Sequence, residues 1–128
     1  MKPPVETVKI SARGREILIK VKRNTGIERW NEICRVALCQ SLANPTIPPK
    51  SLSRGDTAIE IEWKTFAGEF SHELASAVII RAYNDGIKTE TSASVSDYFR
   101  SHMERGIASL QNTRDLVSYI LRSCAPEK

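Results

Sequence analysis

The pattern that most constrains the fold lies in residues 5–42, where a short alternating segment, a basic amphipathic stretch, a glycine and a second apolar stretch follow one another. In the first segment the apolar Val8 and Ile10 alternate with polar residues, which predicts a short strand with one polar face. Its outward side chains are those of Thr7, Lys9 and Ser11. A strand this short cannot form a sheet alone, so we expect it to pair with another, most simply from a second copy of the chain.

Two helices are predicted after this strand. The first runs from about Arg13 to Thr25 and ends at Gly26, a typical C-terminal stop. Its apolar stripe consists of Ile17, Leu18, Val21 and Thr25. The second runs from about Ile27 to Leu42, and its apolar surface is wide enough for two packing partners, which indicates an oligomer.

The second half of the chain predicts an extended segment and further helices. Residues Ala58–Lys64 alternate as a strand does, although they could instead form an extended arm over the helices. Helices are expected over about Glu69–Asn84, from Ser94 or Ser96 to Leu110, and over Thr113–Ser123, with a polar loop at Thr89–Ser94. The inward stripe of the first of these would be Phe70, Leu74, Ala77, Val78 and Arg81. Gly106 within a helix indicates the close approach of another backbone.

The expected fold class is therefore mainly α, with a strand-helix-helix part in residues 5–42 and an extended segment plus about three helices in residues 57–124. That order is the layout of ribbon-helix-helix DNA-binding proteins. Residues 1–128 form one expected domain, because a chain with 41% apolar residues can bury a core without disulfides or metal.

Positive charge is concentrated at the start of the chain. Residues 1–35 contain nine Lys and Arg against four Glu, a net charge of +5, whereas the whole chain carries +4. This asymmetry favours contact with a polyanion such as DNA over a merely solvated helix face. The side chains expected to contact the nucleic-acid backbone are Lys9, Arg13, Arg15, Lys20, Lys22 and Arg23.

Base-specific recognition is less well supported by the sequence. In a ribbon-helix-helix protein, the outward strand residues enter the major groove and the start of the second helix holds a phosphate. Here Ile27 and Glu28 occupy the predicted start of that helix, and a carboxylate there competes with phosphate for the helix amides.

The sequence contains no catalytic motif. His72 and His102 are expected at surface or packing positions, and we expect neither enzymatic activity nor a metal or cofactor. The alternative is a DNA-nicking enzyme that uses Tyr83, Tyr98 or a Glu/His pair.

The cysteines favour a reducing compartment. Cys34, Cys39 and Cys124 are odd in number and lack CxxC spacing, which argues against a disulfide framework and a zinc site. We expect Cys34 and Cys39 to be buried structural residues. With no predicted membrane helix or signal peptide, the expected location is the cytoplasm.

Several segments together resemble the DndE family of bacterial DNA phosphorothioation proteins. They are TVKISARGREILIKVKRNTGIERWNEICRVALCQSL, Asn44-Pro45, Ile47-Pro48, Thr65–Glu69 and His102–Ile107, and they cover nearly the whole chain. The resemblance implies a DndE-like domain with a ribbon-helix-helix-like N-terminal part. It also implies a tetrameric DNA-binding component that prefers nicked double-stranded DNA and accompanies DndC and DndD.

In such a system a cysteine desulfurase supplies the sulfur that replaces a non-bridging phosphate oxygen. The resemblance assigns no catalytic residue. It leaves open a third role, that of a scaffold that joins DndC and DndD without contacting DNA.

Overall fold

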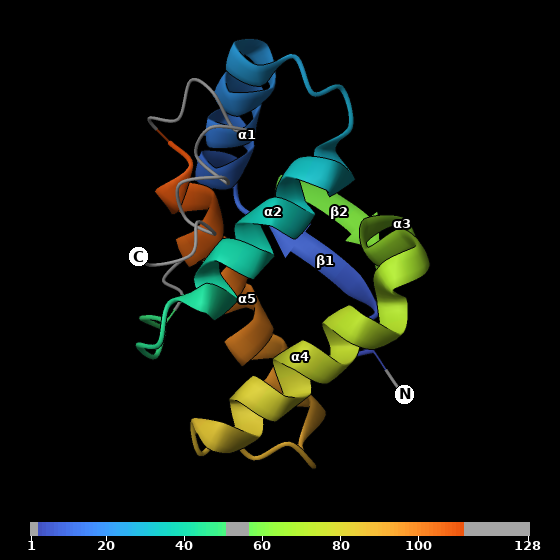
Figure 1. The fold of residues 1–128 in the computed structure, drawn as a ribbon, viewed down its shortest axis with the longest axis vertical. Helices are drawn as coiled ribbons and strands as arrows, with labels where there is room; N and C mark the ends of the chain where they lie inside the picture. Colours follow the sequence, from blue (N-terminus) through green and yellow to red (C-terminus); the bar gives the residue numbers. More distant parts are fainter. Residues whose placement is uncertain (1–2, 51–56, 112–128) are drawn as a thin grey trace, which may run out of the picture.

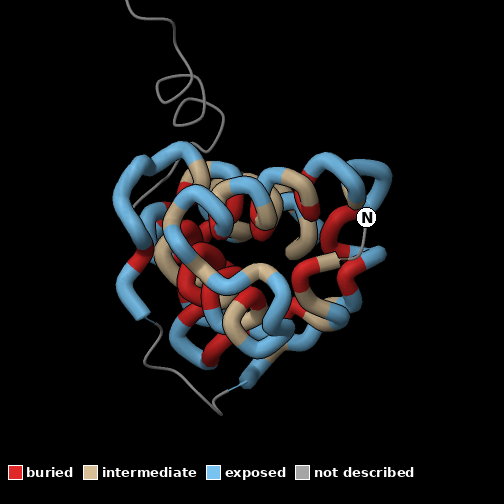
Figure 2. Tube along the Cα trace, turned by 90° about the horizontal axis from the view of Figure 1, so that it is seen from below, coloured by how far each residue is buried: buried red, intermediate tan, exposed pale blue. Residues whose placement is uncertain are grey.

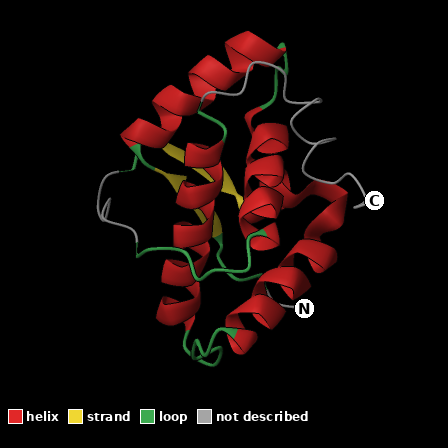
Figure 3. Ribbon diagram, turned by 60° about the vertical axis from the view of Figure 1, so that its left-hand side comes forward, coloured by secondary structure: helices red, strands yellow, loops and turns green. Residues whose placement is uncertain are grey.

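The computed structural model describes residues 3–50 and 57–111 and is mainly helical, with one small antiparallel sheet (Figures 1 and 3). The last predicted helix, over residues 113–123, lies outside the described residues. The elements are β1 (Thr7–Ile10), α1 (Ala12–Thr25), α2 (Trp30–Ala43), β2 (Ile59–Glu62), α3 (Trp63–Ala67), the 3-10 turn η1 (Gly68–Phe70), α4 (Ser71–Asn84) and α5 (Ser92–Ser109).

The predicted pairing of the first strand with a second copy is wrong, because β1 pairs with β2 of the same chain. Val8 lies opposite Ile61 and Ile10 opposite Ile59, so one face of the sheet is apolar and covers the core. Residues Ile59–Glu62 of the predicted segment therefore form a strand and not a loose arm, whereas its last two residues, Trp63 and Lys64, begin α3. The order strand, helix, helix is as predicted, and any further likeness to ribbon-helix-helix proteins stays a prediction.

Local signals fix both ends of α1. The Ser11 hydroxyl accepts a hydrogen bond from the Gly14 N–H at 3.1 Å, which caps the first turn. Gly26 ends the helix with a φ of 76°, and its N–H donates to the Lys22 carbonyl. Between these ends Ile17, Leu18 and Val21 are buried, as the apolar stripe predicts.

Helices α2 and α5 cross at the centre of the molecule (Figure 1), and Gly106 allows the close approach that the sequence predicted. A Cβ atom at Gly106 would lie 1.9 Å from the Ala37 carbonyl oxygen and 2.5 Å from its carbon. The two backbones can therefore meet here only because residue 106 has no side chain.

The core lies between this crossing and the sheet, where buried segments from distant parts of the sequence meet (Figure 2). Three aromatic rings join α3, which follows β2 directly, to α5. The Trp63 centroid is 5.4 Å from that of Phe66 and 5.9 Å from that of Phe99, and the Phe66 and Phe99 rings meet edge to face. The end of the sheet is thus fixed against α5.

Two predicted helix starts differ from the structure. Helix α2 begins at Trp30 and not at Ile27, and residues 26–29 form an irregular connection that starts at the left-handed Gly26. Helix α5 already begins at Ser92, within the predicted polar loop.

The predicted helix over residues 69–84 is interrupted at its start. Gly68 has a φ of 57°, which separates α3 from the later turns, and α4 begins only at Ser71. The inward stripe is consequently shifted: Leu74, Ala75, Val78 and Ala82 are buried, whereas Phe70 and Ala77, both predicted to face inward, are exposed.

Among the described residues, none of the helices combines the length and the apolar character needed to cross a bilayer.

We predict that Gly106→Ala destabilises the protein by about 3 kcal/mol or more, because the added methyl overlaps the α2 backbone, which cannot rotate away as a side chain can. Denaturant unfolding measures the change. The control is Ala108→Gly at an exposed position of the same helix, which should cost only about 1 kcal/mol. Equal losses of stability for the two variants would contradict this account of the crossing.

Candidate nucleic-acid interface

All six side chains predicted to contact nucleic acid lie at the surface. Lys22 is half-buried, and the other five are exposed: Lys9, Arg13, Arg15, Lys20 and Arg23. They do not form one compact patch.

The cations of α1 occupy most of its outer half. Arg13 and Lys20 are two turns apart on one flank, and Arg15 and Lys22 repeat that spacing on the other flank, roughly 160° around the helix. Arg23 lies between the two rows, two turns along the helix from Glu16, which is the one acidic residue of α1. The outer half of the helix is thus strongly basic across its whole width.

The second row reaches the start of α2. The Lys22 ammonium lies 5.5 Å from the centre of the Trp30 ring, within the range of a cation–π contact. The first turn of α2 contains Glu32 and has no side-chain cap. Glu28 was expected to disfavour phosphate at the start of this helix, but it lies before the first turn. Glu32 has that effect instead, because its carboxylate lies within the first turn.

The outward face of the sheet does not have the composition of a DNA-reading surface. Thr7 lies opposite Glu62 and Lys9 opposite Glu60, so two carboxylates share the face that was expected to enter a major groove. Ser11, the third residue expected to point outward, is buried as the cap of α1. The prediction for Ser11 is therefore wrong.

Lys9 and Arg13 instead line a recess between α1 and α5, with a volume of about 420 Å³. Two cations that the sequence did not single out, Lys50 and Arg105, line the same recess. Among the described residues of its lining the one acid is Glu104, which lies 3.7 Å from Arg100. Its apolar side chains include Ile10, Ile17, Met103 and Ile107.

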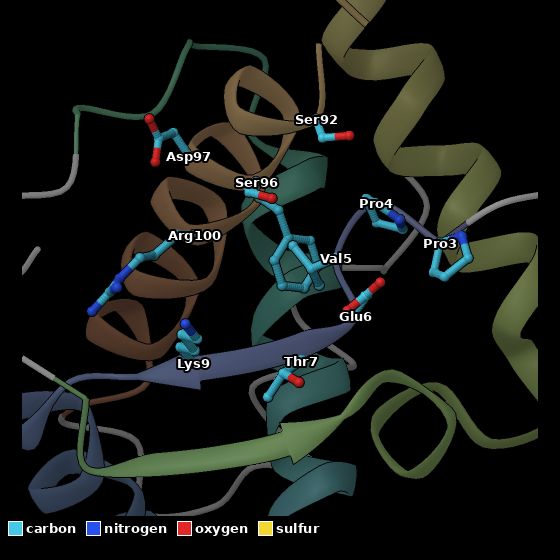
Figure 4. A pocket seen from close by; sticks show the side chains of 11 residues that line it. Pro3, Pro4, Val5, Glu6, Thr7, Lys9, Ser92, Ser96, Asp97 and Arg100 are labelled. Carbon is cyan, nitrogen blue, oxygen red and sulfur yellow. The ribbon is translucent and has the colours of Figure 1, made fainter. Parts of the chain in front are cut away.

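A second recess of about 420 Å³ adjoins the edge of β1 that faces away from β2 (Figure 4). Lys9 points from β1 toward the side on which Arg100 of α5 lies. Glu6 and Asp97 line the same recess, so its charges balance. It attracts a polyanion less than the recess between α1 and α5 does.

Two arginines hold the connection that leads to Lys50. Arg105 donates from Nη1 to the Thr46 carbonyl at 3.0 Å and from Nη2 to the Ser41 carbonyl at 2.8 Å. Arg81 donates to the same Thr46 carbonyl at 2.7 Å and to the Leu42 carbonyl at 2.8 Å. The connection is therefore fixed to both α4 and α5 by charge-assisted hydrogen bonds.

A buried relay extends from Arg105 to His102. The Arg105 Nε–H donates to the Ser41 hydroxyl oxygen at 2.9 Å, and the same hydroxyl shares a hydrogen bond of 2.7 Å with His102 Nδ1. The tautomer of His102 decides which of these two groups donates. Burial and the nearby charges of Arg105 and Arg81 lower the pKa of His102 to about 4.

A carboxylate completes this network. Asp85 accepts hydrogen bonds from the Tyr98 hydroxyl at 2.6 Å and from Arg81 Nε at 2.9 Å. Burial alone would raise the pKa of Asp85, but these two hydrogen bonds lower it overall. Burial and the hydrogen bond to Asp85 raise the pKa of Tyr98.

The two described cysteines differ. Cys34 is buried as predicted, and burial raises the pKa of its thiol to about 12. Cys39 is exposed on the outer side of α2, so its predicted burial is wrong. Cys124 lies outside the described residues.

These features describe a small helical protein with a basic helix surface beside a cation-lined recess. The family model described as "DNA sulphur modification protein DndE" matches residues 7–118. The chain therefore belongs to the DndE family, which places it in DNA phosphorothioation, as its sequence indicates. No curated protein matches the chain.

We predict that the free energy of unfolding falls as the pH is lowered from about 6.5 to about 4, by at most about 1.4 kcal/mol per pH unit from His102. In this window the unfolded histidine binds a proton and the folded one does not. Above it both forms are neutral, and below it both are charged. Urea unfolding at several pH values should give a steeper pH dependence for the wild type than for His102→Gln. Identical slopes would show that this residue does not titrate as described.

Proposed function

We propose that the protein is a non-enzymatic DNA-binding subunit of the phosphorothioation machinery that holds the duplex backbone through its basic surface. The supporting observation is the outer half of α1, which carries five cations, Arg13, Arg15, Lys20, Lys22 and Arg23, against the single Glu16. Phosphate contacts of this kind position a protein on DNA without reading its sequence. The duplex is thereby presented to the other subunits, DndC and DndD.

The sheet favours this backbone-directed mode. Glu60 and Glu62 face outward beside Lys9, and carboxylates at this position would be repelled by phosphates if the sheet entered a groove. A preference for nicked DNA is compatible with such a surface, because a nick makes the duplex easier to bend against a rigid protein.

The enzymatic alternative finds little support in the two tyrosines. The Tyr98 hydroxyl donates to Asp85, and its raised pKa makes it a weak nucleophile. Tyr83 is 74% exposed, so water would have free access to any group that reacts at its hydroxyl.

A self-associating role has its own supporting observation. Large apolar side chains are exposed on η1 and on the outer side of α4: Phe70 of η1 is 45% exposed, and Ile80 and Tyr83 of α4 are 60% and 74% exposed. Between α2 and the start of α4 a groove of about 360 Å³ is lined largely by apolar atoms of Val36, Phe70 and Leu74. We propose that this surface contributes to a homo-oligomer, a tetramer, that multiplies the basic helices available to one duplex.

We predict that Lys20→Gln combined with Arg23→Gln weakens binding to intact and nicked duplexes alike. The slope of log K against log salt should become less negative by about one for each phosphate that the variant no longer neutralises. Fluorescence anisotropy at several salt concentrations measures both effects. Lys64→Gln, at an exposed position of α3, is the matched control and should leave the slope unchanged.

Two results would contradict this function. Salt-insensitive, equal binding to both duplexes would argue against a backbone clamp. Full DNA modification in cells after charge reversal of Lys20, Lys22 and Arg23 would instead favour a scaffold, because a scaffold keeps DndC and DndD together without touching DNA.

We predict that Ile80→Glu reduces the mass measured by sedimentation equilibrium, because a charge within an apolar interface is costly to bury. Ile47→Glu is the matched control: Ile47 is 59% exposed, but it lies on the connection after α2 and lines a different recess, together with Ile87 and Tyr98. An unchanged mass for Ile80→Glu would exclude this face from the oligomer.

A further inference from the structure

The recess between α1 and α5 combines a cationic rim with an apolar floor. Lys9, Arg13 and Lys50 reach it from β1, α1 and the connection after α2, whereas the exposed Pro49 and Ala108 supply apolar surface above the buried Ile17 and Met103. With Arg105, the described part of the lining contains four cations against Glu104. Such a lining suits a ligand that is anionic at one end and largely apolar in its body.

The backbone on two sides of the recess is anchored by hydrogen bonds within the protein. Lys50 follows the connection that Arg81 and Arg105 anchor at the Thr46 carbonyl. On the opposite side the Ser11 cap fixes the first turn of α1, which carries Arg13. Because these backbone segments are already anchored, the entropy lost on binding is mainly that of the exposed cationic side chains.

We infer that this recess binds the terminal nucleotide of a DNA strand that carries a phosphate monoester. Lys9, Arg13 and Lys50 contact the phosphate, and the sugar and base lie over the floor that includes Ile17 and Met103. This inference deepens the proposed function and rests on it, because it identifies the part of the duplex that the basic surface receives.

The chemistry distinguishes a strand end from an internal phosphate. A phosphate monoester has a second pKa near about 6 and is mostly dianionic at neutral pH, whereas each internal diester carries one charge. An internal nucleotide must also leave its stack and its base pair before it can enter a recess, which costs a few kcal/mol. A nucleotide at a nick has already lost one covalent neighbour, so its displacement costs less.

The test uses one duplex with a single central nick in three forms, with a 5′-phosphate, a 3′-phosphate or only hydroxyls at the break. At constant salt, one of the phosphorylated nicks should bind about tenfold more tightly than the hydroxyl nick, as expected for an added charge-assisted hydrogen bond. Arg13→Gln and Lys50→Gln should each reduce this ratio toward one.

The control variant is Arg15→Gln, on the opposite flank of α1. It should weaken binding to all three nicks and leave their ratio unchanged. A ratio of one in the wild type, with tight binding to every nick, would overturn the inference and leave the proposed function intact.

A second measurement keeps the inference testable if duplex binding is absent, which would refute the proposed function. In amide NMR spectra, thymidine 5′-monophosphate should shift the signals of Gly14, Ile17 and Lys50. Thymidine without the phosphate should shift them much less. Equal shifts with the two compounds, or none, would overturn the inference.

Discussion

The contact between Gly106 and Ala37 is the constraint on which the rest of the structure depends. It lets the backbones of α5 and α2 touch. The sheet and α1 then pack against α5 as well. The aromatic rings of Trp63, Phe66 and Phe99 then join the sheet to the same helix. The recess between α1 and α5 depends on the same contact, because the contact fixes the position of α5.

The polar network at one end of the crossing performs a different task from the apolar core. Arg81 and Arg105 meet at one carbonyl, that of Thr46, and their charges are balanced only in part, by Asp85. Two cations held this close are tolerated because nearly every donor has a partner. The network thus fixes an irregular segment that has no secondary structure of its own.

The sequence predicted what local signals determine and missed what distant elements create. The stop at Gly26, the burial of Ile17 and Leu18 and the close approach at Gly106 were predicted, and the structure confirms them. The cap at Ser11 was missed, because the alternation of the strand placed this residue on the outward face. The partner of β1 was mispredicted because its pattern specifies a face but not the strand that pairs with it. Lys50 and Arg105 were missed because the recess combines elements far apart in the chain.

The pairing of β1 with β2 within one chain has a consequence for biosynthesis. On the ribosome the first strand has no partner until Glu62 and the residues that follow it have emerged. The basic helix is made early, but its apolar side is covered only in part, by α2, until α5, still later in the chain, has been synthesised. A shortened chain that contains only the strand-helix-helix part would therefore expose the core side of α1, and the basic helix cannot serve as an independent module.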